Sequence, residues 1–139
     1  MMKSFNPSKT VKNLKLRTVG SGGEALGEDL LEWGKQILGV GINEFYGQTE
    51  CNLTVSNCGA IMPTKQGSIG KPVPGHEVKI VNYKGELIKE PGLDGEIIVK
   101  SNTPVSFLKY WDEFRQNRPL FDLFLYSKKF CLIYQDGSN

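Results

Sequence analysis

The chain has 139 residues, one domain's worth, of which 39% are hydrophobic and 23% charged. This composition can bury a core and is not that of a disordered protein. The net charge is +2 with both signs interspersed, which argues against a nucleic-acid-binding face. No apolar run reaches membrane-spanning length and the N-terminus lacks an apolar signal segment, so we expect no membrane span.

The first part of the chain predicts a βαβ unit. An apolar run at 14–19 indicates a strand, the glycines at 20–23 a tight turn, and 40–46 a second strand. Between them a helix is expected over 24–38, followed by Gly39 as a natural stop. Its apolar face is formed by Leu26, Leu30, Trp33 and Ile37. The two strands of such a unit should be parallel.

The pattern then changes to short strands with Gly/Pro turns. Strands are expected over 76–81, 86–88 and 96–100, with turns at 83–85 and 91–95. Such a succession favours a small antiparallel or barrel-like module.

The three cysteines are Cys51, Cys58 and Cys131, an odd number without the spacing of a disulfide framework. We therefore expect reduced thiols and a cytoplasmic protein. Cys51, Cys58 and His76 lack paired C-x-x-C knuckles and a fourth ligand, so a zinc site is not expected.

Residues 43–50, N-E-F-Y-G-Q-T-E, combine groups that suit a nucleotide site. The ring of Tyr46 can stack on a purine, and Gly47 lets another molecule approach the backbone. The hydroxyl of Thr49 can bond a phosphate oxygen, and the carboxylate of Glu50 can hold Mg²⁺. The alternative is a strand end and turn, with Glu50 in solvent.

Residues 20–25, G-S-G-G-E-A, offer a different nucleotide hypothesis. They satisfy G-x-G-x-x-A between the expected strand and helix, and Glu44 ends the next strand where dinucleotide folds place a ribose-binding acid. This pattern predicts a small NAD-type dinucleotide-binding module. A glycine turn that only joins strand to helix would match it equally well.

Four stretches in order resemble one family: L-R-T-V-G-S-G-G-E-A-L at 16–26, 43–50, G-S-I-G-K-P-V-P-G at 67–75 and G-E-I-I-V at 95–99. A closing F-L-K-Y-W at 107–111 resembles the segment before that family's ribose-binding loop. The resemblance is to the acyl-adenylate-forming (AMP-binding) enzymes, specifically the AMP-forming acyl-CoA synthetases that include acetyl-CoA and medium-chain synthetases. Because order and spacing agree as well, it outweighs the single glycine motif.

The resemblance implies an α/β fold: a βαβ piece of a larger adenylate-forming N-terminal domain, followed by a small β-rich (barrel-like) module. Residues 1–66 would be the βαβ part and 67–111 the β-rich module of the same domain. Residues 112–139 would be a divergent tail, in which aromatic and aliphatic residues crowd without a clean period.

The resemblance also implies an activity. Such enzymes convert a carboxylic acid and ATP to an acyl-adenylate and pyrophosphate, then pass the acyl group to coenzyme A and release AMP. By motif, Gly23, Glu24 and Ala25 would line the adenine. Tyr46 would stack on the adenine and Glu44 would lie near its amino edge.

The same motif implies the catalytic groups. Thr49 would bond the α-phosphate and Glu50 would hold Mg²⁺, in a reaction that depends on positioning and on stabilising phosphoryl charge. Gly47 stands where acetate-specific relatives carry a bulky tryptophan. A glycine there predicts a deeper pocket and an acid longer than acetate.

The family's phosphate loop, its ribose-binding Thr-Gly-Asp and its C-terminal catalytic lysine find no counterpart in these 139 residues. We therefore expect a fragment with no synthetase activity alone and at most weak nucleotide binding. A non-catalytic remnant that acts only by association, with the remaining part of a split synthetase as partner, is the other hypothesis.

Overall fold

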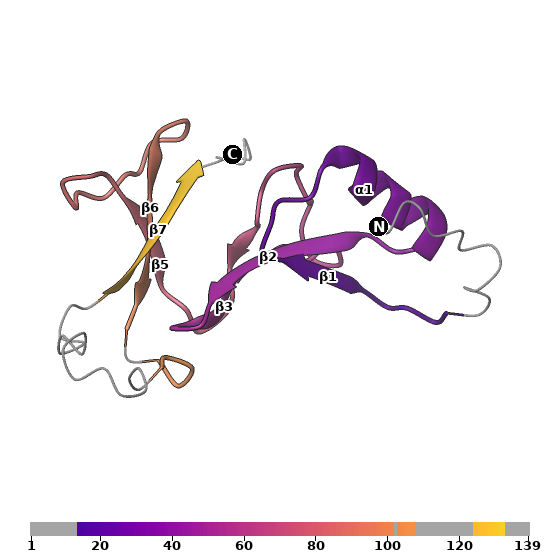
Figure 1. Ribbon diagram of the computed structural model, residues 1–139, viewed down its shortest axis with the longest axis horizontal. Coiled ribbons are helices and arrows are strands. Elements are labelled where there is room, and N and C mark those ends of the chain that lie inside the picture. The colour runs from indigo at the N-terminus through magenta and orange to yellow at the C-terminus, as the bar shows by residue number, and fades with distance from the viewer. Residues whose placement is uncertain (1–13, 102, 108–123, 133–139) are drawn as a thin grey trace. The chain divides into compact units, whose positions relative to one another are not determined.

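The computed structural model describes residues 14–101, 103–107 and 124–132 (Figure 1). The elements are β1 (Val19–Gly22), α1 (Glu28–Trp33), the π-helical turn η3 (Gly34–Leu38), β2 (Ile42–Gln48), β3 (Asn52–Ser56), β4 (Lys71–Pro72), β5 (Val78–Val81), β6 (Asp94–Lys100) and β7 (Phe124–Leu132). They form two sheets, with strand orders β1-β2-β3-β4 and β5-β6-β7. None of the helices in these ranges has the length and apolarity to cross a membrane.

The chain divides into two compact units that interleave along the sequence. The first comprises residues 1–46 and 55–71, and the second comprises 47–54 and 72–139. Each unit is described by itself below. The division of the sequence at residues 66 and 111 stays a prediction.

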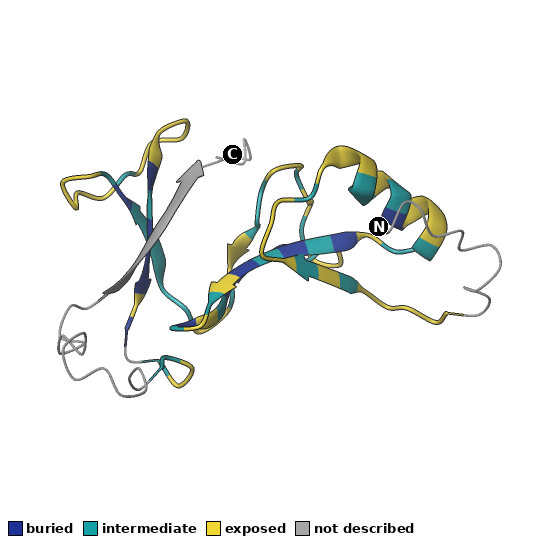
Figure 2. Cartoon of the chain, viewed as in Figure 1, coloured by how far each residue is buried: buried dark blue, intermediate teal, exposed yellow. Residues whose placement is uncertain are grey.

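The predicted βαβ unit is confirmed. Strands β1 and β2 pair in parallel, with Val19 opposite Ile42 and Gly22 opposite Phe45, and α1 lies between them in the chain. Burial alternates along β2, as expected for a strand with one covered face (Figure 2).

The predicted boundary between strand and glycine turn is wrong. Leu14 is 55% exposed and outside any strand, whereas Gly20 and Gly22 lie within β1. The reason is the ring of Phe45: a Cβ added to Gly22 would lie only 2.5 Å from its Cε2. Because both glycines lack side chains, the ring can cover this stretch of β1 and the strand continues to Gly22.

The predicted helix begins later and changes its winding. It starts at Glu28 rather than residue 24, and from Gly34 it continues as the π-helical turn. A π turn holds more residues than an α turn, so later side chains rotate away from the expected apolar face. Ile37 is accordingly 39% exposed and Leu38 is half-buried. Gly39, in the left-handed conformation at φ 72°, ends the helix as predicted.

Gly34 marks the place where the helix packs most closely on the sheet. It is buried, and a Cβ at this position would lie 2.7 Å from the Cδ1 of Ile42. The glycine lowers intrinsic helix stability, but it admits the Ile42 side chain.

Replacing Gly34 with alanine should destabilise the chain. The gain in helix propensity is about 1 kcal/mol, whereas overpacking against Ile42 costs about 1–3 kcal/mol. We expect a net loss in the free energy of unfolding, measured by urea denaturation. Gly41→Ala is the matched control, because an added Cβ there meets nothing within 4 Å. Equal stability of the two variants would contradict this account.

Strand β3 follows β2 in a hairpin that the sequence pattern did not reveal. The amide of Asn57 donates to the carbonyl oxygen of Glu44 at 2.8 Å. The buried side chain of Asn57 donates to the carbonyl oxygen of Ser68 at 2.5 Å, which anchors the glycine-rich loop at 67–70. Gly70 completes this contact, since any Cβ there would overlap the backbone of Ser56.

The second unit contains the antiparallel sheet β5-β6-β7, which confirms the expected β-rich module. The predicted turn at 83–85 is also confirmed, because Gly85 has φ 81° and its amide donates to the carbonyl oxygen of Asn82 at 2.9 Å. Strand β6 is buried on both faces at Ile97, Ile98 and Val99. Strand β7, from the segment left unassigned, pairs with β6.

Candidate functional site

In the first unit, β2 carries Glu44 and Tyr46 on its covered face. They are 5% and 8% exposed, and they share this face with the buried Ile42 (Figure 2). Glu44 therefore lies in the middle of the strand, and its predicted place at the strand's end is wrong. Tyr46 is buried, and the stacking of its ring on adenine stays a prediction.

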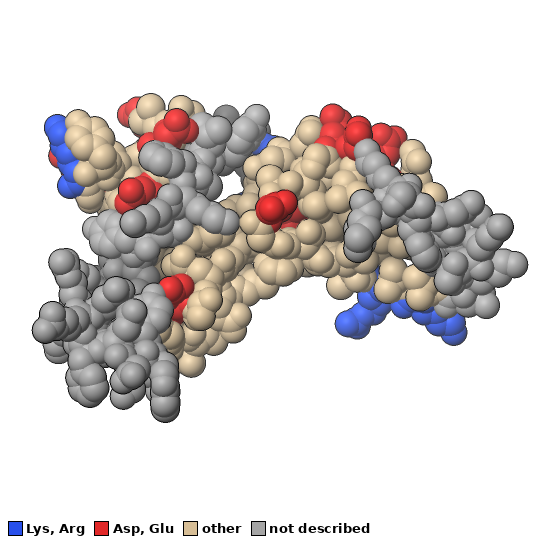
Figure 3. Space-filling model, in the orientation of Figure 1, with Lys and Arg blue, Asp and Glu red and all other residues tan. Residues whose placement is uncertain are grey.

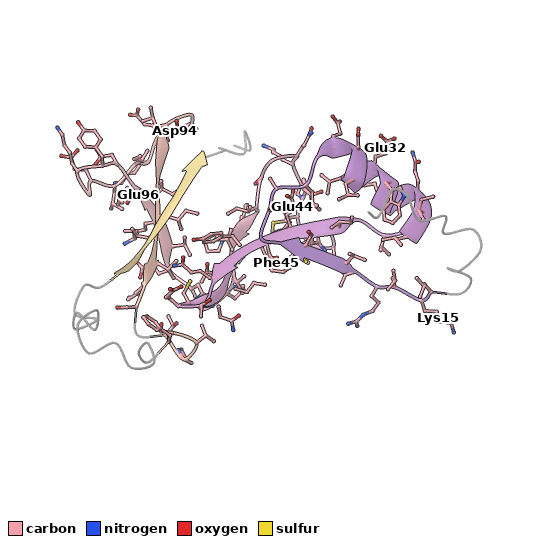
Figure 4. The ribbon with its side chains drawn as sticks, in the orientation of Figure 1. Lys15, Glu32, Glu44, Phe45, Asp94 and Glu96 are labelled. Carbon is pink, nitrogen blue, oxygen red and sulfur yellow. The ribbon has the colours of Figure 1, made fainter. Side chains whose placement is uncertain are left out.

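The segment 23–25 lies beside Glu44. It leaves β1 through Gly23, whose φ of 99° is one that side chains disfavour, and Glu24 and Ala25 are exposed. The amide of Leu26 then donates to Oε1 of Glu44 at 2.8 Å (Figure 4, where Glu44 is labelled). The structure thus brings the carboxylate of Glu44 to the end of the segment predicted to line the adenine.

In the second unit, Thr49 and Glu50 occupy the tight turn between β2 and β3. The amide of Cys51 donates to the carbonyl oxygen of Gln48 at 3.1 Å and closes this turn. Thr49 is exposed and Glu50 is half-buried. The carbonyl oxygen of Glu50 accepts a hydrogen bond from the amide of Phe107 at 2.9 Å, so the turn is held at its acidic residue.

Two of these contacts were not visible in the sequence. The amides of Leu26 and Phe107 are backbone donors, which residue identity does not distinguish from any other. Asn52 did carry a signal, because asparagine tolerates the left-handed conformation that it adopts here at φ 58°. That signal marks the end of the turn and the start of β3.

The packing of the hairpin explains why position 47 is a glycine. A Cβ at this position would overlap the carbonyl oxygen of Asn52, on the facing side of the hairpin. The glycine is therefore required for close approach of the two backbones, whatever lies beyond it. The expected deeper acyl pocket stays a prediction, because the close approach of the two backbones also explains the glycine.

Gly47→Ala should open the hairpin. The backbone of Asn52 must shift to admit a methyl group, and we expect a loss of about 1–3 kcal/mol in the free energy of unfolding. Amide exchange should also accelerate at Cys51, whose hydrogen bond closes the turn. Gly41→Ala again serves as the control. An alanine variant with unchanged exchange at Cys51 would show that the hairpin does not need the glycine.

Cys51 is an inert thiol in this turn. It is 1% exposed, and burial raises the pKa of its thiol, while hydrogen bonding with Gln48 acts in the opposite direction. Cys58 is half-buried, and both cysteines are unpaired. A raised pKa and low access both reduce the thiolate available for alkylation.

We expect iodoacetamide at pH 8 to modify Cys58 before Cys51 in the folded chain. Because burial raises the pKa of the Cys51 thiol, its labelling rate should continue to rise with pH beyond the pKa of a free thiol, where the thiolate fraction of a free thiol levels off. Peptide mapping by mass spectrometry measures both rates, and unfolding in urea should make them similar. Faster labelling of Cys51 in the folded chain would contradict the described burial.

The donor set suits a magnesium ion better than a zinc ion. The described ranges contain no group of three or more His, Cys, Asp or Glu side chains that could hold a metal. Mg²⁺ needs less from a protein, because one or two carboxylates suffice when substrate phosphates and waters complete its octahedron. The carboxylate of Glu50, beside the hydroxyl-bearing Thr49, is compatible with such a shared ion.

The dinucleotide hypothesis fails on the structure. Gly20 and Gly22 lie in a strand, so they form no glycine turn at a helix N-terminus. The helix starts at Glu28, and its first turn holds Glu28 and Asp29. Acidic side chains gather over α1 in Figure 3, where a pyrophosphate would be repelled.

The sequence matches the AMP-binding enzyme family over residues 1–111. The chain therefore belongs to the AMP-binding enzyme family, the class that the resemblance indicated. Within this family its similarity is to acyl-CoA ligases.

An uncharacterized acyl-CoA ligase of Bacillus subtilis, YtcI, is 38% identical over 100 residues, which is 70% of this chain and 18% of that protein. The 4-hydroxybutyrate–CoA ligase 1 of Metallosphaera sedula is 38% identical over 101 residues, or 71% of this chain and 18% of that protein. The chain thus spans about a fifth of the length of these relatives.

A solved structure shares the fold. The O-succinylbenzoate coenzyme A synthetase of Bacillus subtilis, in complex with ATP and magnesium ion, superposes with a TM-score of 0.70 at 28% identity. The match covers 89% of this chain and 26% of that one. This likeness confirms the α/β fold of an adenylate-forming enzyme.

Proposed function

We propose that this chain carries part of the adenylate site of an AMP-forming acyl-CoA synthetase. The reaction joins a carboxylic acid to ATP as an acyl-adenylate with release of pyrophosphate, and then transfers the acyl group to coenzyme A with release of AMP. The observation that carries the proposal is the turn between β2 and β3. It presents an exposed hydroxyl at Thr49 and a half-buried carboxylate at Glu50 on consecutive residues, within the family's motif.

In this proposal Thr49 bonds the α-phosphate and Glu50 holds Mg²⁺. Negative charge grows on the phosphoryl oxygens during acyl attack, and a hydroxyl donor with a bound cation would stabilise it. The likeness to the O-succinylbenzoate synthetase, which was solved in complex with ATP and magnesium ion, supports a nucleotide and Mg²⁺ as the ligands of this site. Gly23, Glu24 and Ala25 would line the adenine, on a segment whose exposed backbone leaves room for it.

We also propose the identity of the acyl acceptor and the size of the acid. Coenzyme A is supported by the acyl-CoA ligases among the relatives. We propose an acid longer than acetate because Gly47 leaves room for it. The close approach of Asn52 is a separate reason for that glycine. We further propose that turnover needs groups beyond these 139 residues, including a phosphate-binding loop, carried by the same or a separate polypeptide. A cytoplasmic setting is supported by the unpaired state of Cys51 and Cys58.

Calorimetric titration of the 139-residue chain with AMP and with Mg·ATP tests the site. We expect weak binding of both nucleotides. Glu50→Gln should weaken Mg·ATP about tenfold, since a neutral amide is a poor magnesium ligand, and should leave magnesium-free AMP unchanged. Thr49→Val should weaken both nucleotides through loss of one phosphate hydrogen bond.

NAD and a distant acid serve as controls for that titration. Glu96→Gln removes a half-buried carboxylate from β6 and should leave Mg·ATP binding unchanged. NAD should bind no better than AMP. A chain that binds neither nucleotide, or binds Mg·ATP equally with Glu50→Gln, would overturn the assignment of these residues.

A further inference from the structure

The segment 23–25 is short and is fixed at both of its ends. At one end Gly22 pairs in β1 opposite Phe45. At the other end the amide of Leu26 donates to Glu44 at 2.8 Å, and the carbonyl oxygen of Gly27 accepts the amides of the first helical turn. Three exposed residues therefore span two anchored points.

The position of Glu44 is fixed by its backbone hydrogen bonds and its burial, so it can anchor that segment. Its backbone lies opposite Ser21 in the parallel ladder. Its carbonyl oxygen accepts the amide of Asn57, directly after β3, at 2.8 Å, so the residue is held on both sides. Its side chain is only 5% exposed, which leaves the carboxylate few alternative positions.

A buried carboxylate needs strong partners, and a backbone amide is a suitable one. The bond from the amide of Leu26 to Oε1 of Glu44 is 2.8 Å long, within the ordinary range of a well-formed hydrogen bond. Gly27, at the start of α1, makes no side-chain cap. The bond from Leu26 to Glu44 thus links the turn before the helix to the sheet.

We infer that Glu44 is a positioning residue: through the amide of Leu26 it holds the Gly23–Glu24–Ala25 segment in the shape that receives the nucleotide. This inference rests on the proposed adenylate site, and it changes the part played by Glu44. The Oε1 atom of Glu44 already accepts the amide of Leu26, so the carboxylate serves the protein's own backbone before any nucleotide binds. The segment, held in advance, binds with less loss of conformational entropy.

Two substitutions separate this role from direct contact with the nucleotide. Glu44→Gln keeps an acceptor oxygen of the same reach but removes the charge, whereas Glu44→Ala removes the acceptor. Amide exchange at Leu26, measured by NMR, reports the hydrogen bond without any nucleotide. Calorimetry with AMP reports the consequence for binding. Glu32→Ala is the matched control, because it removes an exposed helical acid that bonds only Gln36 among the described contacts.

We expect Glu44→Ala to accelerate exchange at Leu26 about tenfold or more and to weaken AMP binding. Glu44→Gln should restore most of the protection and most of the affinity, and Glu32→Ala should change neither. If Glu44→Ala fails to fold, Glu44→Gln decides the matter alone.

Three results would overturn the inference. They are unchanged exchange at Leu26 in Glu44→Ala, full AMP affinity in an alanine variant that has lost this protection, and lost AMP affinity in a glutamine variant that keeps it. The last would assign Glu44 to the nucleotide itself through its charge. A wild-type chain that binds no AMP refutes the proposed function separately, because exchange at Leu26 still shows whether Glu44 holds the segment.

Discussion

The packing of one aromatic ring on glycine backbone fixes the arrangement of the first unit. Phe45 covers Gly20 and Gly22; a Cβ at Gly22 would clash with the ring, and one at Gly20 would lie close to it at 3.1 Å. This contact sets the register in which β1 and β2 pair, with Gly22 opposite Phe45. Because side chains alternate along a strand, the register places Glu44 on the opposite face from Phe45, toward the segment before the helix (Figure 4). A slip of one residue would exchange the two faces and remove the carboxylate from Leu26.

The sequence predicted the order of elements well and their boundaries less well, for identifiable reasons. Hydrophobic spacing found the helix, the parallel pair and the two strands that correspond to β5 and β6, because these depend on local periodicity. It placed a turn at Gly20 because glycine usually signals one, whereas here glycine makes room for Phe45, a residue 23 to 25 positions away in the chain. Strand β3 escaped because its signal is the left-handed Asn52, and Ile37 was misplaced because the π-helical turn shifts the helical phase. A contact distant in sequence thus decided the boundary between β1 and the turn that follows it.

The site residues also differ in how much of their role is evident from residue type and how much only from the structure. Residue type was enough to single out Thr49 and Glu50, since their chemistry is visible in the letters. The structure adds what they are attached to: a turn closed by the amide of Cys51 and held at Glu50 by the amide of Phe107. For Glu44 the residue type suggests contact with the ligand, and that contact stays a prediction. The structure adds that its buried side chain accepts a backbone amide of its own unit.

The residues of the motif differ in how directly they indicate nucleotide binding, because the fold alone explains some of them. The approach of Asn52 explains the glycine at position 47, and the amide of Leu26 explains an acceptor oxygen at position 44, so the fold alone accounts for both features. Thr49 is different: it is exposed in the turn, where a serine, asparagine or aspartate would suit the backbone as well. Folding therefore gives little reason for a threonine there, whereas a phosphate ligand does. Among the motif residues, Thr49 is the one whose presence argues most directly for nucleotide chemistry, and Thr49→Val is accordingly the substitution that separates a working site from a conserved scaffold.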